Sequence, residues 1–155
     1  MSFRITGLDP APFGRFYGLS DEELRFLKVR RYIADVKPGF PDRVELTDAE
    51  PGEPVLLLNY VHQPADTPYK ASHAIFVREG AETPYEAVDE IPPALEIRPL
   101  SLRAFDAAGD MIGAELTGGA DVEAAVKRLF ADPAAAYIHA HYAKRGCYAA
   151  RIDRA

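Results

Sequence analysis

The sequence predicts an α+β fold with a mostly antiparallel β-sheet of about eight strands and two or three helices. Segments with the alternation or the short apolar runs of strands outnumber those with helical periodicity. The 13 prolines and 11 glycines are spread along the whole chain and separate these segments by turns. With 155 residues, 48% of them hydrophobic and 27% charged, the chain has the size and composition of a single globular domain, residues 1–155.

Two segments have helical patterns. Ser20 and Glu23 match a capping box, which predicts a helix from about Asp21 to Lys28. Apolar residues at helical spacing predict a second helix over Asp121 to Phe130. A helical turn is also expected at Tyr85 to Val88.

The predicted strands alternate with turn residues. Val55 to Val61 is apolar on both faces, which predicts a core strand covered on both sides. Gly109 allows the positive φ of a hairpin between two later strands. The chain from Met111 to Tyr137, which includes the second helix, is expected to be a crossover joining parallel strands. The predicted strands are Phe3 to Leu8, Arg30 to Val36, Arg43 to Thr47, Val55 to Val61, Ala74 to Glu79, Pro99 to Asp106, Met111 to Thr117 and the two strands of a ribbon over Tyr137 to Asp153.

Composition excludes some functions. The net charge of −6 opposes unspecific binding to nucleic acid, which relies on phosphate neutralisation by Lys and Arg. A single cysteine favours a reducing compartment. The beginning of the sequence lacks the apolar core of a signal peptide, and no apolar run is long enough to cross a bilayer. We therefore expect a cytoplasmic protein without nucleic-acid or membrane partners; the sequence leaves a homodimer open.

The C-terminal ribbon concentrates reactive side chains, because it carries two of the four histidines and the only cysteine. A three-residue loop of Lys144, Arg145 and Gly146, with Gly146 in the left-handed region, predicts its register. A loop of two or four residues would instead pair Tyr142 with Cys147. The predicted pairs are Ala143 with Cys147, His141 with Ala149, and His139 with Arg151.

This register separates the ribbon into two faces. The apolar face consists of Ile138, Ala140, Tyr142, Tyr148, Ala150 and Ile152. The polar face consists of His139, His141, Cys147, Arg151 and Asp153.

His139 and His141 have the spacing of a metal-binding pair, because alternate residues of a strand point the same way. The alternative is that both rings donate hydrogen bonds to neighbouring loops. We assign no metal ligands, since no spacing selects a third ligand among His62, Cys147, His73 and Asp153.

Other candidates have two readings each. Cys147 is a nucleophile if a base or positive charge lies close, and otherwise a small buried hydrophobe. Asn59 and His62 precede a proline-rich loop and are placed to line a pocket, unless Asn59 serves buried backbone groups and His62 is solvated. Arg78 and Arg103 either hold a carboxylate or phosphate bidentately or are sheet-face arginines paired with acidic residues, and we favour the second interpretation.

Three sequence blocks resemble the bacterial family called domain of unknown function 1203. They are FRITGLD, PGEPVLLLNYVHQPADTPYKASHAIFVREG and LFADPAAAYIHAHYAKRGCYAARIDR. The resemblance covers essentially the whole chain. It implies a bacterial, single-domain protein and carries no assigned activity, cofactor or catalytic residue.

The sequence thus predicts a domain that binds a small polar or anionic ligand at the C-terminal hairpin. His139 and His141 would form hydrogen bonds or transfer protons, and Arg151 would bind the anion. The alternatives are a metal-assisted or thiol-dependent enzyme that uses the same groups, and a non-catalytic interaction domain. No cofactor and no catalytic residue is assigned. The predicted ligand-binding residues are His139, His141, Cys147, Arg151, Asn59 and His62.

Overall fold

The computed structural model describes residues 1–155 and confirms the α+β class. Nine strands form a six-stranded sheet in the order β5-β1-β9-β8-β6-β7 and a three-stranded sheet in the order β2-β3-β4; every pairing is antiparallel. The strands are β1 (Phe3–Thr6), β2 (Arg30–Ile33), β3 (Pro54–Gln63), β4 (Ala71–Arg78), β5 (Glu86–Val88), β6 (Pro99–Phe105), β7 (Met111–Gly118), β8 (Tyr137–Tyr142) and β9 (Tyr148–Arg154). The helices are α1 (Asp21–Phe26), α2 (Pro93–Glu96) and α3 (Val122–Phe130), with 3-10 turns at Gly14–Phe16 and Gly119–Asp121.

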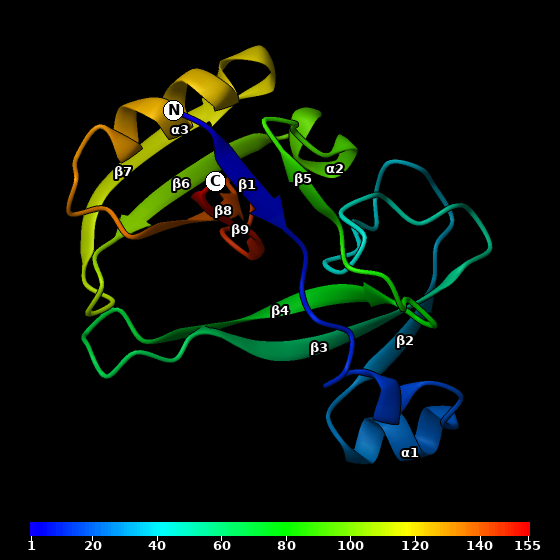
Figure 1. The fold of residues 1–155 in the computed structure, drawn as a ribbon. Helices are drawn as coiled ribbons and strands as arrows, with labels where there is room; N and C mark the ends of the chain where they lie inside the picture. Colours follow the sequence, from blue (N-terminus) through cyan, green and yellow to red (C-terminus); the bar gives the residue numbers. More distant parts are fainter.

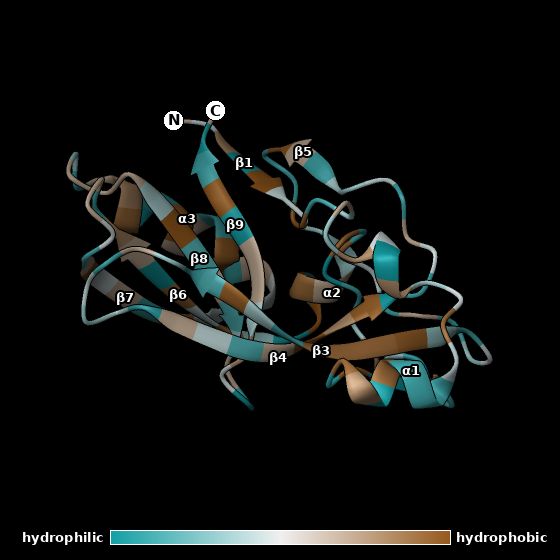
Figure 2. Ribbon diagram, turned by 90° about the horizontal axis from the view of Figure 1, so that it is seen from below, coloured by the Kyte–Doolittle hydropathy of each residue, from teal (hydrophilic) through white to brown (hydrophobic).

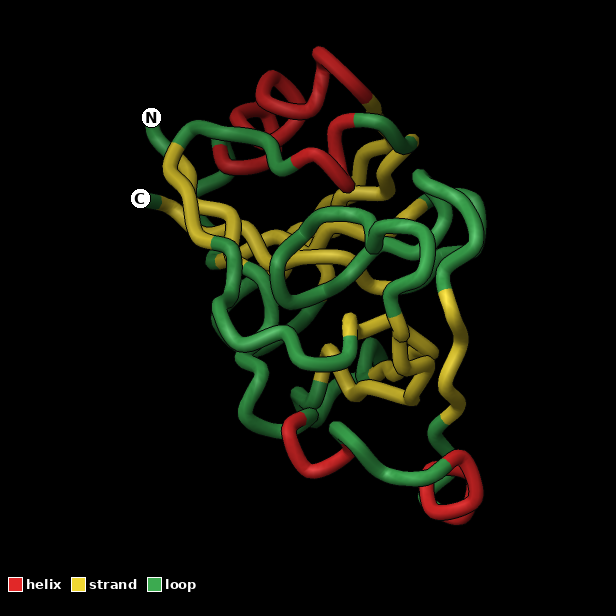
Figure 3. Tube along the Cα trace, turned by 90° about the vertical axis from the view of Figure 1, so that its right-hand side faces the viewer, coloured by secondary structure: helices red, strands yellow, loops and turns green.

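The molecule is layered. Helix α3 covers one face of the six-stranded sheet, and the β3–β4 pair lies against the opposite face (Figure 1). Helices lie at two ends of the molecule with the strands between them (Figure 3). The two chain ends meet, because Phe3 in β1 pairs with Arg154 in β9. No helix combines the length and apolarity that crossing a bilayer requires.

Both predicted helices are confirmed. The Ser20 side chain accepts from the Glu23 backbone N–H, and the Glu23 carboxylate accepts from the Ser20 N–H, so the capping box is complete. Helix α3 buries Val122, Ala125, Val126 and Phe130 against the sheet. It also makes the predicted crossover: β7 and β8 are both antiparallel to β6, which lies between them, so they run in the same direction.

Two local predictions are wrong, and one short helix is missed. Residues 43–47 form turns, because buried Arg43 and Leu46 turn inward from a loop. Residues 86–88 form edge strand β5 instead of a helical turn, because pairing with β1 satisfies their backbone. The short helix α2 went unpredicted; Pro93 at its first position begins it.

Strand β3 is covered on both faces where it begins and on one face where it ends, so the predicted two-sided core strand is confirmed only for its first part. Val55, on the outer face, is buried against Ala34 and Ala49. Leu56 and Leu58 are buried between the sheets, whereas Asn59 and Val61 are exposed on the outer face. Figure 2 shows that β3 is hydrophobic along its stretch beside α1. The polar end of β3, beyond that stretch, brings His62 into the space between the sheets, where the functional candidates gather.

The register of the ribbon differs from the predicted one. His139 lies opposite Arg151 as expected, but a bulge follows, and His141 lies opposite Tyr148. The Tyr142 N–H donates to the Cys147 carbonyl at 2.9 Å, so the loop has four residues, 143–146. A bulge adds one residue to a strand and reverses the side chains beyond it.

This bulge exchanges two side chains between the faces of the sheet. Tyr148 contacts the histidines, and Cys147 packs against the hydrophobic core that contains Tyr142. The prediction that the sulfur atom shares a face with His139 and His141 is therefore wrong. Gly146 does adopt the expected positive φ, at 78°.

Candidate histidine site

All four histidines of the chain meet between the two sheets. One nitrogen from each of His62, His73 and His141 lies within 4.8 Å of the other two. His139 lies beside this triad, with its ring centroid 5.9 Å from that of His62 and 6.4 Å from that of His141. The sequence placed two of these rings together; the fold adds the other two.

Strand geometry explains the convergence. His73 pairs with Tyr60 across β3 and β4, so both point between the sheets. The next inward residue of β3, His62, occupies a bulge between Val61 and Gln63. Gln63 fixes this end of β3, because its amide donates to the Tyr137 hydroxyl of β8 at 2.8 Å.

The rings are packed as a column with one ring across it. His62 stacks on His73 at 4.6 Å, with the planes 5° apart, and also on Tyr148 at 5.2 Å. His141 meets both His62 and His73 nearly perpendicularly, at 81°. Tight packing therefore holds three potential ligand nitrogens in a small volume.

One hydrogen bond orients His141. Its Nδ1 lies 2.9 Å from the carbonyl oxygen of Gly146. A carbonyl only accepts, so Nδ1 carries the proton and donates it, and Nε2 is left with a lone pair. Metal-binding histidines are typically held by such a bond from the second ring nitrogen. Nε2 of His141 is buried without a partner.

Further buried ring nitrogens also have no hydrogen-bond partner. They are both nitrogens of His62, Nδ1 of His73 and Nδ1 of His139. An unsatisfied buried polar group costs about 1–3 kcal/mol. These nitrogens are therefore available as acceptors or ligands between the two sheets.

Burial keeps the rings neutral. Desolvation, aided by the charges of His73 and Arg103, lowers the pKa of His62 to about 4. Desolvation also lowers the pKa of His139 and of His141 to about 3. The pKa of His73 is lowered by the same cause. Neutral imidazole is the form that binds a metal ion.

Arg103 of β6 stands beside the cluster. It pairs with His139 across β6 and β8, and Ser101 pairs with His141, so both share the face of the histidines. The guanidinium Nε donates to the Ser101 hydroxyl at 3.3 Å, and no carboxylate forms an ion pair with it. Arg78 does pair with Glu45, as expected, whereas the predicted acidic partner of Arg103 is absent.

Comparison with known protein families matches residues 39–154 to the family described as "Protein of unknown function (DUF1203)". The chain belongs to the DUF1203 family. The matched region includes the four histidines and Arg103. No curated protein and no solved structure shows significant similarity to the chain.

In this DUF1203 protein the other predicted ligand residues lie apart from the triad. Asn59 is exposed on the outer face of β3. Arg151 shares the face of His139 but already forms an ion pair with Asp153 at 2.8 Å and stacks over Tyr137. Cys147 accepts a hydrogen bond from Arg43 at 3.2 Å on the other side of the sheet.

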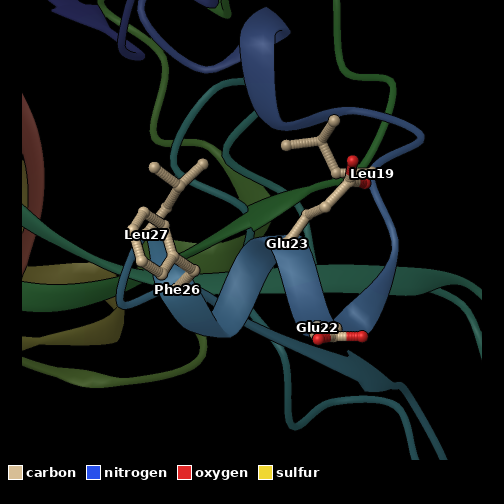
Figure 4. Close-up of a pocket in the computed structure, with 5 residues that line it drawn as sticks. All are labelled: Leu19, Glu22, Glu23, Phe26 and Leu27. Atoms are coloured by element: carbon tan, nitrogen blue, oxygen red, sulfur yellow. The ribbon is translucent and has the colours of Figure 1, made fainter.

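The DUF1203 protein also has a surface hollow on α1, lined by Leu19, Glu22, Glu23, Phe26 and Leu27. In Figure 4 the Phe26 ring and Leu27 stand at one end of this hollow and Leu19 at the other. It contains neither histidine nor arginine. The convergence of unpartnered polar groups singles out the histidine cluster as the candidate site.

Three members of this site are not among the ligand-binding residues that the sequence predicts. His73 is one of several possible third ligands, the favoured partner of Arg103 is an acidic residue, and the predicted register puts Tyr148 on the apolar face. A signal for His73 existed, because an antiparallel pairing of β3 with β4 about a short loop brings His62 and His73 together. No sequence signal reveals the bulge that turns Tyr148.

Proposed function

We propose that the protein binds a divalent transition-metal ion through His62, His73 and His141, and that a small polar or anionic ligand binds at this metal. The observation that carries the proposal is the approach of three ligand nitrogens to within 4.8 Å of one another, among neutral imidazoles that each keep at least one ring nitrogen without a hydrogen-bond partner. Three histidines are the ligand set of one type of catalytic zinc site.

Loading the site requires a modest closing movement. Ligand nitrogens of a tetrahedral zinc site, with bonds of about 2.0–2.1 Å, lie about 3.4 Å apart. His62 and His73 are stacked, so their planes need to tilt for both in-plane lone pairs to reach one ion. The exposed Ser72 beside His73 and the irregular backbone at His62 favour these strand positions for such a shift.

The donor set favours particular metals. Imidazole suits Zn²⁺, Ni²⁺, Co²⁺ and Cu²⁺, whereas Mg²⁺ and Ca²⁺ prefer oxygen ligands. Three protein ligands leave a fourth position for water or a ligand. This open position is what makes a binding or catalytic role, rather than a purely structural one, the better inference.

A metal-assisted enzyme is the second candidate. His139 favours it, because its Nδ1 is buried, unpartnered and outside the triad. A neutral imidazole in this place would form a hydrogen bond that orients a water molecule or a polar substrate group. The single free cysteine favours a cytoplasmic location for either function.

The test is isothermal titration of chelator-treated protein with Zn²⁺, together with the visible spectrum after loading with Co²⁺. We expect one ion per chain and a Co²⁺ absorption typical of four-coordinate sites. His73→Gln and His141→Gln should weaken binding at least about 100-fold, because each removes a ligand.

His139→Gln is the matched control. It replaces a histidine of the same cluster and similar burial but leaves the triad intact. We expect its Zn²⁺ affinity to stay within a few-fold of the wild type. Absence of stoichiometric binding in the folded wild type, or equal losses in His139→Gln and His141→Gln, would refute the proposed triad.

A further inference from the structure

We propose that this site binds an oxyanion, either a carboxylate or a phosphate group. The Arg103 guanidinium would bind the anion while one of the anion's oxygens occupies the open position of the metal. The inference deepens the proposed function and rests on it for the role of the metal. The evidence for the role of Arg103 is separate from the evidence that defines the three histidine ligands.

The first observation is the missing partner of Arg103. Among the other partly buried arginines, Arg31, Arg78 and Arg98 each pair with a carboxylate. Buried Arg43 donates to two carbonyl oxygens and a sulfur atom. Arg103 has only the Ser101 hydroxyl, at 3.3 Å. Four of its five N–H groups are therefore free for a ligand, which corresponds to the donor fork that binds oxyanions bidentately.

The second observation is the sign of the local charge. Of the three arginines whose charges act on the four rings, Arg151 is paired with Asp153 and Arg43 makes its contacts on the other side of the sheet, so the unpaired charge on the face of the histidines is that of Arg103. A bound divalent cation would add two positive charges. A partly buried site with this excess is stabilised by an anion, although the whole chain carries a net charge of −6.

The third observation is placement. Arg103 lies opposite His139 and one pleat from Ser101, which lies opposite His141. On the neighbouring strand away from β8, Arg103 lies opposite Ala114 of edge strand β7, and Ala114 is exposed. The guanidinium, which is only partly buried, is therefore accessible to an anion and lies on the same face of the sheet as the histidine cluster. The Ser101 hydroxyl adds a neighbouring donor.

The experiment follows the Co²⁺ spectrum of the loaded protein during titration with acetate, succinate and inorganic phosphate. Glycerol is the uncharged control. We expect at least one of the anions to shift the spectrum at saturable concentration, and Arg103→Met to weaken that effect about 10- to 100-fold while retaining Co²⁺. Comparing succinate with phosphate identifies the type of oxyanion. Arg103→Lys should recover only part of the effect, because lysine lacks the fork.

Arg151→Met is the matched control, since Arg151 lies on the same face but is paired with Asp153. Its anion affinity should remain near that of the wild type. A larger loss in Arg151→Met than in Arg103→Met, or no response to any anion in Co²⁺-loaded wild type, would overturn the inference and leave the metal site standing. If Co²⁺ does not bind, calorimetric titration of the metal-free protein with phosphate and succinate tests Arg103 separately. Anion binding that is lost in Arg103→Met would support the role of Arg103 as the anion-binding residue. Absence of anion binding in the wild type would overturn it.

Discussion

His62 at the end of β3 and Tyr148 at the start of β9 stack with their ring centroids 5.2 Å apart and their planes 11° apart. The contact joins the two sheets directly at the histidine cluster. It exists because both residues adjoin strand irregularities: His62 lies in one bulge, and Tyr148 follows the ladder shift between Ala140 and His141. Bulges commonly re-aim side chains beside functional sites.

Replacing Tyr148 tests this contact. Tyr148→Ala removes a ring that is 3% exposed, and we expect the free energy of unfolding to fall by about 3–5 kcal/mol. Tyr148→Phe keeps the ring stacked on His62 and should stay within about 1.5 kcal/mol of the wild type, with unchanged Zn²⁺ affinity. Urea denaturation and calorimetry measure both quantities. Equal stability of Tyr148→Ala and the wild type would contradict the packing described.

The buried histidines predict a pH dependence of stability. The pKa of His139 and of His141 is lowered to about 3 in the folded protein, against 6.5 in an unfolded chain. Between these values the unfolded state binds protons that the folded state does not. The free energy of unfolding should therefore be maximal above pH 6.5 and fall as the pH decreases, by up to about 1.4 kcal/mol per pH unit for each histidine.

Urea denaturation of metal-free protein from about pH 8 down to about pH 5 measures this slope. His139→Gln should reduce the slope, because it removes one of the titrating rings. Ser20→Ala is the control: losing the N-cap of α1 should lower stability by about 1 kcal/mol at every pH without changing the slope. A flat profile in the wild type would show that the rings are not buried as described.

Cys147 and Arg43 provide a test on the other side of the sheet. Arg43 is 2% exposed, donates to the carbonyls of Pro41 and Tyr148 and to the Cys147 sulfur, and lies over the Tyr142 ring. Arg43→Met should lower the free energy of unfolding by about 3 kcal/mol or more, because it leaves buried acceptors without a donor. Cys147→Ala should cost about 1 kcal/mol, for the lost sulfur contacts.

Neither substitution should change Zn²⁺ affinity more than a few-fold at a temperature where the variant is folded. Calorimetric titration measures this, after circular dichroism has established folding. Loss of metal binding in folded Cys147→Ala would instead return the sulfur atom to the site, as the sequence-based register predicted.

Local patterns accounted for much of the fold. The capping box of α1 and the apolar stripe of α3 mark helices, whose backbone groups bond within the segment, and the alternation along β6, β7 and β8 marks strands with one buried face, so neighbouring residues suffice to predict these elements. Residues 86–88 and 43–47 were mispredicted because their conformation depends on distant partners, β1 for the first and the buried environment of Arg43 for the second.

By itself, the sequence determined the α+β class, the chain order of most elements and the common face of His139 and His141, because these follow from short-range periodicity. Only the tertiary structure decided that His62 and His73 join them, that Arg103 stands beside the cluster without an acidic partner, and that Cys147 faces away. Those relationships depend on which strands pair and where a bulge interrupts the ladder. A single extra residue reverses every side chain beyond it, and the energy that selects this arrangement comes from packing between residues far apart in the chain.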